Sequence, residues 1–255
     1  MITTKSPATW RDLQNAVARI LSECGFIVEV EKRITTARGR VEVDVYAQEI
    51  VQGRSYEILC ECKHWKRAVP QTAIHSFRTV IAEIGANVGY FISLHGFQAG
   101  AFAASELTNI QLVTWNQFQE AFEETWRERY FSPMIEERLD PLLTYTEPLA
   151  PDWFVKLPES EKAEFIHLKE RYDPFGFIMM SLTSYFRIFN KEPLPKLPLE
   201  EHIDPRFKEA IPHELLIATG YREFFDLAIR YGDIAISEFR AIRDRNGLAN
   251  DSPHE

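Results

Sequence analysis

Two short apolar runs near the start of the chain alternate with charged residues, as β-strands do. One covers residues 41–46 and the other residues 56–63, and the segment between them contains Gly53 and is short enough to close a hairpin. Side chains alternate between the two faces of a strand, so Glu61 and Lys63 are predicted to share a face. Asp44, at the end of the partner strand, brings a second carboxylate beside them.

This arrangement predicts chemistry on a phosphodiester. Such a bond is anionic and resists attack, so a catalyst has to neutralise charge and activate water. Mg²⁺ prefers oxygen ligands and keeps several waters, so Asp44, Glu61 and the backbone carbonyl of Cys62 suffice as its protein ligands, with Mn²⁺ as an alternative ion. Lys63 would orient the attacking water and counter the charge that develops. A lone Glu-x-Lys is also a common solvated strand face, but here apolar residues flank it.

Two further residues are candidates for the same site. Glu42 lies two residues before Asp44 on the same strand face, where it either ligates the metal or pairs on the surface with Arg40 or Arg54. Gln71, at the start of the next predicted helix, would hydrogen-bond the attacking water.

Basic and aromatic residues surround these candidates. The predicted nucleic-acid-binding residues are Arg38, Arg40, His64, Lys66 and Arg67. A rim of this size positions a phosphate backbone but does not read bases, and scattered loop charge is the alternative. Trp65 either contacts the nucleic acid or packs at the strand end.

The order of predicted elements indicates an α/β fold. A helix begins at Ser6-Pro7 and stops at Gly25, and a strand over 26–34 precedes the hairpin. Later elements are a helix from Pro70, a strand over 88–94, a helix over 97–107 and a strand over 110–115. Antiparallel strands followed by a crossover helix predict a mixed sheet flanked by helices, with an α-β-β-β-α-β core.

Charge and proline content change together along the chain. Residues 1–119 carry 12 Lys/Arg and 11 Asp/Glu, whereas the remainder carries 17 and 27, which accounts for the net charge of -9. Of the 14 prolines, 12 lie beyond residue 132. We therefore predict a boundary near residues 118–133, with one domain over 1–120 and another over 121–255.

The first of these domains resembles a known family. The stretches 39–45, 61–65, 89–93 and 110–113, with the helix after Pro70 and the alanine-rich helix after Gly96-Phe97, are similar to the restriction-endonuclease-like fold with a PD-(D/E)xK site, in its Mrr-like branch. The resemblance covers about residues 8–120. It implies that Asp44 and Glu61 are the metal-binding acids and Lys63 the motif lysine, although Val43 replaces the motif proline.

The resemblance carries further expectations. Many relatives place a glutamate in the first helix, where this chain has Gln14, as a possible further site residue or as part of a polar helix face. The family implies a metal-dependent DNA endonuclease of restriction or anti-phage defence. The alternative is a catalytically inactive nuclease-like protein that binds DNA or a partner.

The acidic second half predicts helices over 160–172, 175–189 and 221–245, with Gly232 a candidate break in the last. Its net charge would repel DNA, so we expect it to serve homodimerisation, docking of a defence-system partner, or regulation.

Several features point to a cytoplasmic protein without a membrane segment. There is no signal peptide at the start and no apolar run of about 18 residues. The three cysteines, an odd number with Cys60 and Cys62 on one strand face, argue against a disulfide framework.

Overall fold

The computed structural model describes residues 1–37, 39–186 and 195–248. The chain divides into two compact units, Met1–Arg129 and Tyr130–Glu255, called unit 1 and unit 2 below. The predicted DNA-binding residue Arg38 and the predicted helix end at Phe189 lie outside the described residues.

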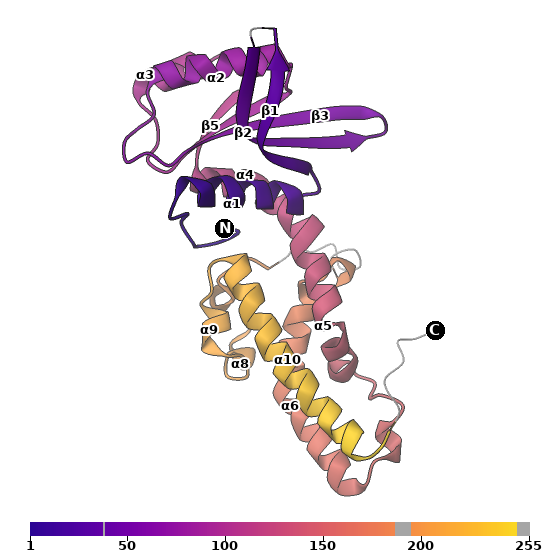
Figure 1. The fold of residues 1–255 in the computed structure, drawn as a ribbon. Coiled ribbons are helices and arrows are strands. Elements are labelled where there is room, and N and C mark those ends of the chain that lie inside the picture. Colours follow the sequence, from indigo (N-terminus) through magenta and orange to yellow (C-terminus); the bar gives the residue numbers. More distant parts are fainter. Residues whose placement is uncertain (38, 187–194, 249–255) are drawn as a thin grey trace. The chain divides into compact units, whose positions relative to one another are not determined.

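Unit 1 is a mixed sheet covered by helices on both faces (Figure 1). Its elements are α1 (Trp10–Glu23), β1 (Ile27–Thr36), β2 (Gly39–Val51), β3 (Arg54–Lys63), α2 (Gln71–Ile84), β4 (Val88–Ser93), α3 (Ala99–Ser105), β5 (Ile110–Thr114) and α4 (Trp115–Trp126). The strand order is β1-β2-β3-β4-β5, antiparallel from β1 to β3 and parallel from β3 to β5. Helices α1 and α4 lie on one face of the sheet, and α2 and α3 on the other. The predicted mixed sheet flanked by helices is confirmed.

Helix α1 begins later than the sequence suggested. Its N-cap is Thr9, whose hydroxyl accepts from the Asp12 N–H at 3.2 Å, while Asp12 Oδ2 accepts from the Thr9 N–H at 2.9 Å. This reciprocal pair satisfies two helix-end donors, which is why the helix starts at Trp10 and not at Ser6-Pro7. Gly25, with φ of +91°, follows the helix end as predicted.

The hairpin of β2 and β3 is longer than the predicted strands. Pairing runs from Val45–Cys60 out to Val51–Arg54, so only two residues turn the chain. Gln52 and Gly53 both have positive φ, 51° and 79°, as a two-residue type I′ turn requires. The predicted connection over 48–55 was therefore too long, because most of its residues continue the strands.

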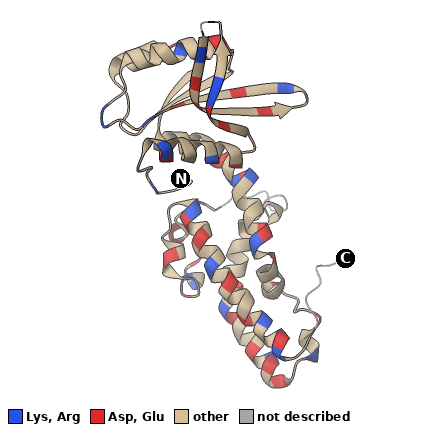
Figure 2. Cartoon of the chain, viewed as in Figure 1, with Lys and Arg blue, Asp and Glu red and all other residues tan. Residues whose placement is uncertain are grey.

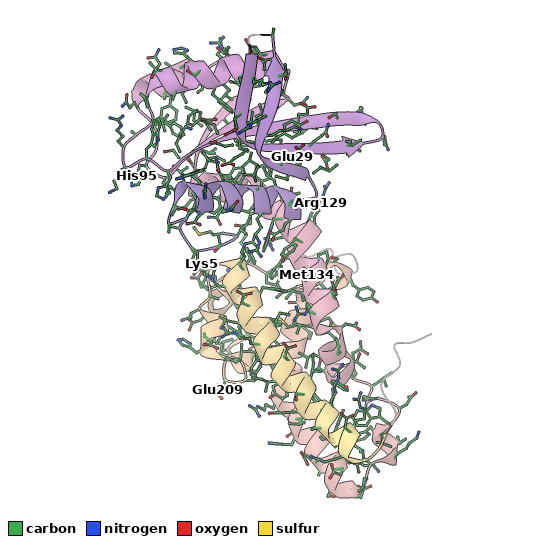
Figure 3. The ribbon with its side chains drawn as sticks, in the orientation of Figure 1. Lys5, Glu29, His95, Arg129, Met134 and Glu209 are labelled. Atoms are coloured by element: carbon green, nitrogen blue, oxygen red, sulfur yellow. The ribbon has the colours of Figure 1, made fainter. Side chains whose placement is uncertain are left out.

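The last helix of unit 1 was not predicted. Thr114 caps α4 through a reciprocal pair with Gln117, and the helix buries an aromatic row: Phe118, Phe122 and Trp126. Arg129 follows it (Figure 3). Its Nη1 donates to Cys24 O at 3.0 Å and to Glu49 Oε1 at 2.8 Å. Unit 1 thus extends past residue 120, where the sequence placed the end of the first domain.

Unit 2 is helical. Its elements are α5 (Ser132–Thr146), η2 (Phe154–Lys156), α6 (Glu159–Ser181), η3 (Leu199–Glu201), α8 (Pro205–Lys208), α9 (His213–Leu216) and α10 (Tyr221–Arg245), with the π-helical turn η1 (Arg127–Phe131) before α5. Helices α5, α6 and α10 pack against one another around buried aromatic rings. Acidic residues are spread along α6 and α10 (Figure 2).

Two helices of unit 2 differ from their predictions. Helix α6 runs unbroken through Pro174, although a proline removes one helix hydrogen bond. The helix continues because Tyr172 and Phe175, on either side of the proline, are buried in the core. It ends at Ser181, so the helix predicted over 175–189 is interrupted at residues 182–183, and residues 184–186 are helical again. Helix α10 has the predicted bounds but no break at Gly232, where an added Cβ would collide with Leu139 of α5. This glycine permits close helix packing.

Among the described residues, no helix is both long and apolar enough to cross a membrane.

Candidate active site

The ladder between β2 and β3 ends just before Asp44. The last paired residues are Val45 and Cys60, whereas β3 continues its parallel pairing with β4 as far as Lys63. Beyond that last pair, the Cys62 N–H donates to Asp44 Oδ2 at 2.7 Å. The carboxylate therefore takes the place of a backbone acceptor where the strands separate, which holds Asp44 beside β3.

Lys63 joins the two acids. Its Nζ forms an ion pair with Glu61 and lies 3.8 Å from Asp44 Oδ2. Because one ammonium contacts both carboxylates, the three side chains form a single cluster. All three are partly exposed, so the cluster is open to solvent at the end of β3.

The electrostatics of this cluster reflect partial burial. Burial, followed by the negative charge of Asp44, raises the pKa of Glu61, and Lys63 offsets only part of that effect. Burial alone would lower the pKa of Lys63, but the charges of Glu61 and Asp44 outweigh it and raise that pKa. Two acids in a partly desolvated site favour a bound cation in addition to the lysine.

Asp44 also lacks a ladder partner on its other side. In the pairing of β1 with β2, Val30 opposes Val45 and Lys32 opposes Val43, but Glu31 and Asp44 between them are not paired. Glu31 has φ of +53°, a left-handed conformation that is costly for a side chain other than glycine. The distortion of β1 thus lies directly opposite Asp44. Strained backbone of this kind is common in functional sites.

This strain gives a stability prediction. The free energy of unfolding of the Glu31→Gly variant should be at least as large as that of the wild type, because glycine adopts positive φ freely. Glu31→Val should lower the free energy of unfolding by about 2 kcal/mol, because a β-branched residue resists that conformation. Urea denaturation measures both. As a control, Glu29→Val on the same strand, where φ is not positive, should change it by less than about 0.5 kcal/mol. Equal effects of Val at 29 and 31 would contradict the assignment of strain.

The structure places the other candidate site residues differently. Glu42 forms a cross-strand ion pair with Arg33 at 2.9 Å, and not with Arg40 or Arg54. Gln71 Nε2 lies 3.0 Å from His75 Nε2 on the exposed side of α2. Neither contact reaches the cluster of Asp44, Glu61 and Lys63.

Gln14 is buried in α1, with only 4% of its surface exposed. It therefore does not belong to a polar helix face, which was one of its two sequence interpretations. Helix α1 packs on β2 and β3, the two strands that carry the acids.

The predicted basic rim is only partly available. The His64 ring is 3.1 Å from the Pro7 carbonyl through Nε2, so it ties the end of β3 to the segment before α1. Arg40, Lys66 and Arg67 are exposed, and none of them forms an ion pair with another residue that the structure describes. These three cations remain the candidates for phosphate contact.

The sequence interpretation missed the loop after β4. Ser93 pairs with Lys63 in the parallel register and is fully buried, and its hydroxyl donates to Gly96 O at 3.1 Å. This loop carries the exposed His95 at the same end of the sheet (Figure 3). The predicted crossover helix between β3 and β4 was a signal for this loop. A crossover makes the two strands parallel, and parallel strands end at the same edge of a sheet.

Comparison with known proteins identifies this part of the chain. Residues 6–122 match the family Mrr_cat, described as restriction endonuclease. These residues form an Mrr-like restriction-endonuclease domain. The resemblance inferred over about residues 8–120 is confirmed, and the Mrr-like domain contains the whole cluster of Asp44, Glu61 and Lys63.

No curated protein matches the chain. In structure the chain is similar to a crystal structure titled as a protein of unknown function, AF1548, with 14% identity over 90% of this chain and 99% of that one. The TM-score of this comparison is 0.38.

The donor chemistry of the Mrr-like domain fits a hard divalent cation. Within the described ranges, no three His, Cys, Asp or Glu side chains converge as a metal-binding group. Mg²⁺ does not need three, because one or two carboxylates with waters and substrate oxygens complete its shell. Asp44, Glu61 and the Cys62 carbonyl would hold it.

Proposed function

We propose that the chain is a metal-dependent endonuclease that hydrolyses DNA phosphodiester bonds, with Mg²⁺ or Mn²⁺ as the ion. The observation that carries the proposal is the contact of one ammonium, Lys63, with the carboxylates of both Asp44 and Glu61 at an open strand end. The membership of residues 6–122 in a restriction endonuclease family supports DNA as the substrate.

The roles of the residues follow from their positions. A bound cation would supply charge neutralisation and a more acidic water. Asp44 is held in place by the Cys62 N–H, so its carboxylate is oriented before any ligand arrives. Lys63 provides a fixed positive charge beside the acids, where it can orient water and stabilise the negative charge of the transition state. Exposed Lys66 and Arg67 would contact the phosphate backbone.

The testing experiment is cleavage of supercoiled plasmid and of single-stranded and linear duplex DNA with Mg²⁺ or Mn²⁺. We expect the wild type to cut and EDTA to stop it. Lys63→Met should lower the rate by about 100-fold or more, because it removes a preorganised charge from the site. Lys156→Met, which removes an exposed lysine from unit 2, should cut like the wild type. Cleavage that survives EDTA or the Lys63 substitution would refute the proposed site.

A second candidate is a nuclease-like domain that binds DNA or a partner without cutting. The observation that favours it is Gln14, an amide buried in α1 where many relatives of the family carry an acid. Under this alternative the wild type and the Lys63→Met variant would both bind DNA, and neither would cleave it.

We further propose that unit 2 serves self-association, partner docking or regulation in a defence system of the cytoplasm. Exposed apolar side chains support this role, among them Leu149, Val155, Phe177 and Ile234. The acidity of the second half disfavours direct DNA contact there.

A further inference from the structure

The five tryptophans of the chain fall into two groups. Trp115, Trp126 and Trp153 are buried, whereas Trp10 and Trp65 expose 48% and 37% of their surfaces. An indole is large and apolar, so leaving it in water forgoes a substantial hydrophobic gain. Both exposed tryptophans belong to the Mrr-like domain.

Trp65 lies beside the candidate catalytic cluster. It follows Lys63 by two residues, and Lys63 Nζ is 5.9 Å from the centroid of its ring, at the outer limit of a cation–π contact. A group stacked on this indole would therefore be a neighbour of the proposed scissile phosphate. The adjacent Lys66 and Arg67 are exposed as well.

Trp10 belongs to the same edge of the domain. The hydrogen-bonding contact between His64 and the Pro7 carbonyl, at 3.1 Å, joins the residue before Trp65 to the segment that leads into α1. Trp10 follows Pro7 by three residues, at most about 11 Å along the chain. The Arg11 guanidinium lies 5.0 Å from the centroid of the Trp10 ring. Each exposed indole thus has a cation at its ring.

Exposed indoles accompanied by cations are the elements with which proteins bind single strands. Bases stack on the aromatic faces while the cations follow the backbone. A fully paired duplex offers no free base face to such a residue, because its bases are stacked on one another. An unpaired or extruded base does offer one. An apolar protein partner would leave the cations without a role, and an anionic lipid surface would be repelled by the adjacent carboxylates of Asp44 and Glu61.

We propose that Trp65, extended by Trp10, stacks unpaired bases next to the scissile phosphate, so that the preferred substrate is single-stranded or locally unpaired DNA. This inference rests on the proposed nuclease function and specifies its substrate class.

Intrinsic fluorescence tests the inference independently of cleavage. The full chain in EDTA, which prevents cutting, is titrated with a 12-nucleotide single strand, the same sequence as a duplex, and vesicles of anionic lipid. We expect the single strand to quench the emission, since two of the five tryptophans are exposed, and to bind at least about 10-fold more tightly than the duplex.

Substitutions then assign the effect to residues. Trp65→Ala should weaken single-strand binding by about 5- to 150-fold, the range of one lost stacking contact, and Trp65→Phe should restore most of it. Trp10→Ala should give a smaller loss. Tyr56→Ala is the matched control, because Tyr56 is an exposed aromatic at the far end of β3 and should leave binding unchanged.

The outcomes separate this inference from the proposed function. If the chain cuts duplex DNA and Trp65→Ala changes neither affinity nor the ratio of single-strand to duplex binding, the inference is overturned and the nuclease stands. If single strands bind in a Trp65-dependent way but no DNA is cut, the nuclease proposal fails and the stacking site stands. Quenching by vesicles and not by DNA would overturn the inference in favour of a lipid surface.

Discussion

Asp44→Asn is expected to lower the rate of DNA cleavage by at least about 1,000-fold while leaving the domain folded. Asparagine keeps an oxygen that can accept from the Cys62 N–H, as Asp44 Oδ2 does at 2.7 Å. It removes the negative charge that the cation and Lys63 require. The substitution therefore separates the chemical role of this residue from its structural role.

Asp44→Ala is the companion variant. It should be equally inactive, but it should also lower the free energy of unfolding by about 1–3 kcal/mol, because the partly buried Cys62 N–H loses its acceptor. Plasmid cleavage and urea denaturation of both variants provide the comparison. An asparagine variant with more than a tenth of the wild-type rate would mean that the charge of Asp44 is not needed for the reaction.

The second large effect concerns the core of unit 2. Phe239→Ala in α10 should lower the free energy of unfolding by about 3–5 kcal/mol, because it leaves a cavity among buried aromatic side chains. Phe239 is fully buried, and its ring centroid lies 4.9 Å from that of Tyr145, 5.1 Å from that of Phe165 and 6.1 Å from that of Tyr172. Helices α5, α6 and α10 each contribute to this cluster.

Denaturation followed by far-ultraviolet circular dichroism measures this loss, since unit 2 is helical. The control is Ile234→Ala on the same helix, whose side chain is 53% exposed and should cost less than about 1 kcal/mol. If the two variants were equally stable, the aromatic cluster would not be the source of the unit's stability.

The sequence predicted most of the nuclease fold because its signals are local. Alternation along β3 places Glu61 and Lys63 on one face whatever the rest of the chain does. The order of helices and strands, with two antiparallel connections before a crossover, restricts the topology to a mixed sheet. Both expectations follow from properties of neighbouring residues.

Errors arose where packing overrides a local signal. Pro174 predicts a helix end, yet α6 continues through it because both flanking segments are anchored in the core. Gln14 is polar and is nevertheless buried in α1. Helix α4 was not predicted.

By itself, therefore, the sequence determined the strand faces, the mixed sheet and the identity of the three charged residues of the candidate site. Only the tertiary structure decided how they meet. Asp44 lies where the ladders to β1 and to β3 are both interrupted, and the contact between His64 and Pro7 joins the end of β3 to the segment before α1. Both features involve residues far apart in the chain. Such contacts depend on the complete packing of the sheet and helices, which no local pattern of residues encodes.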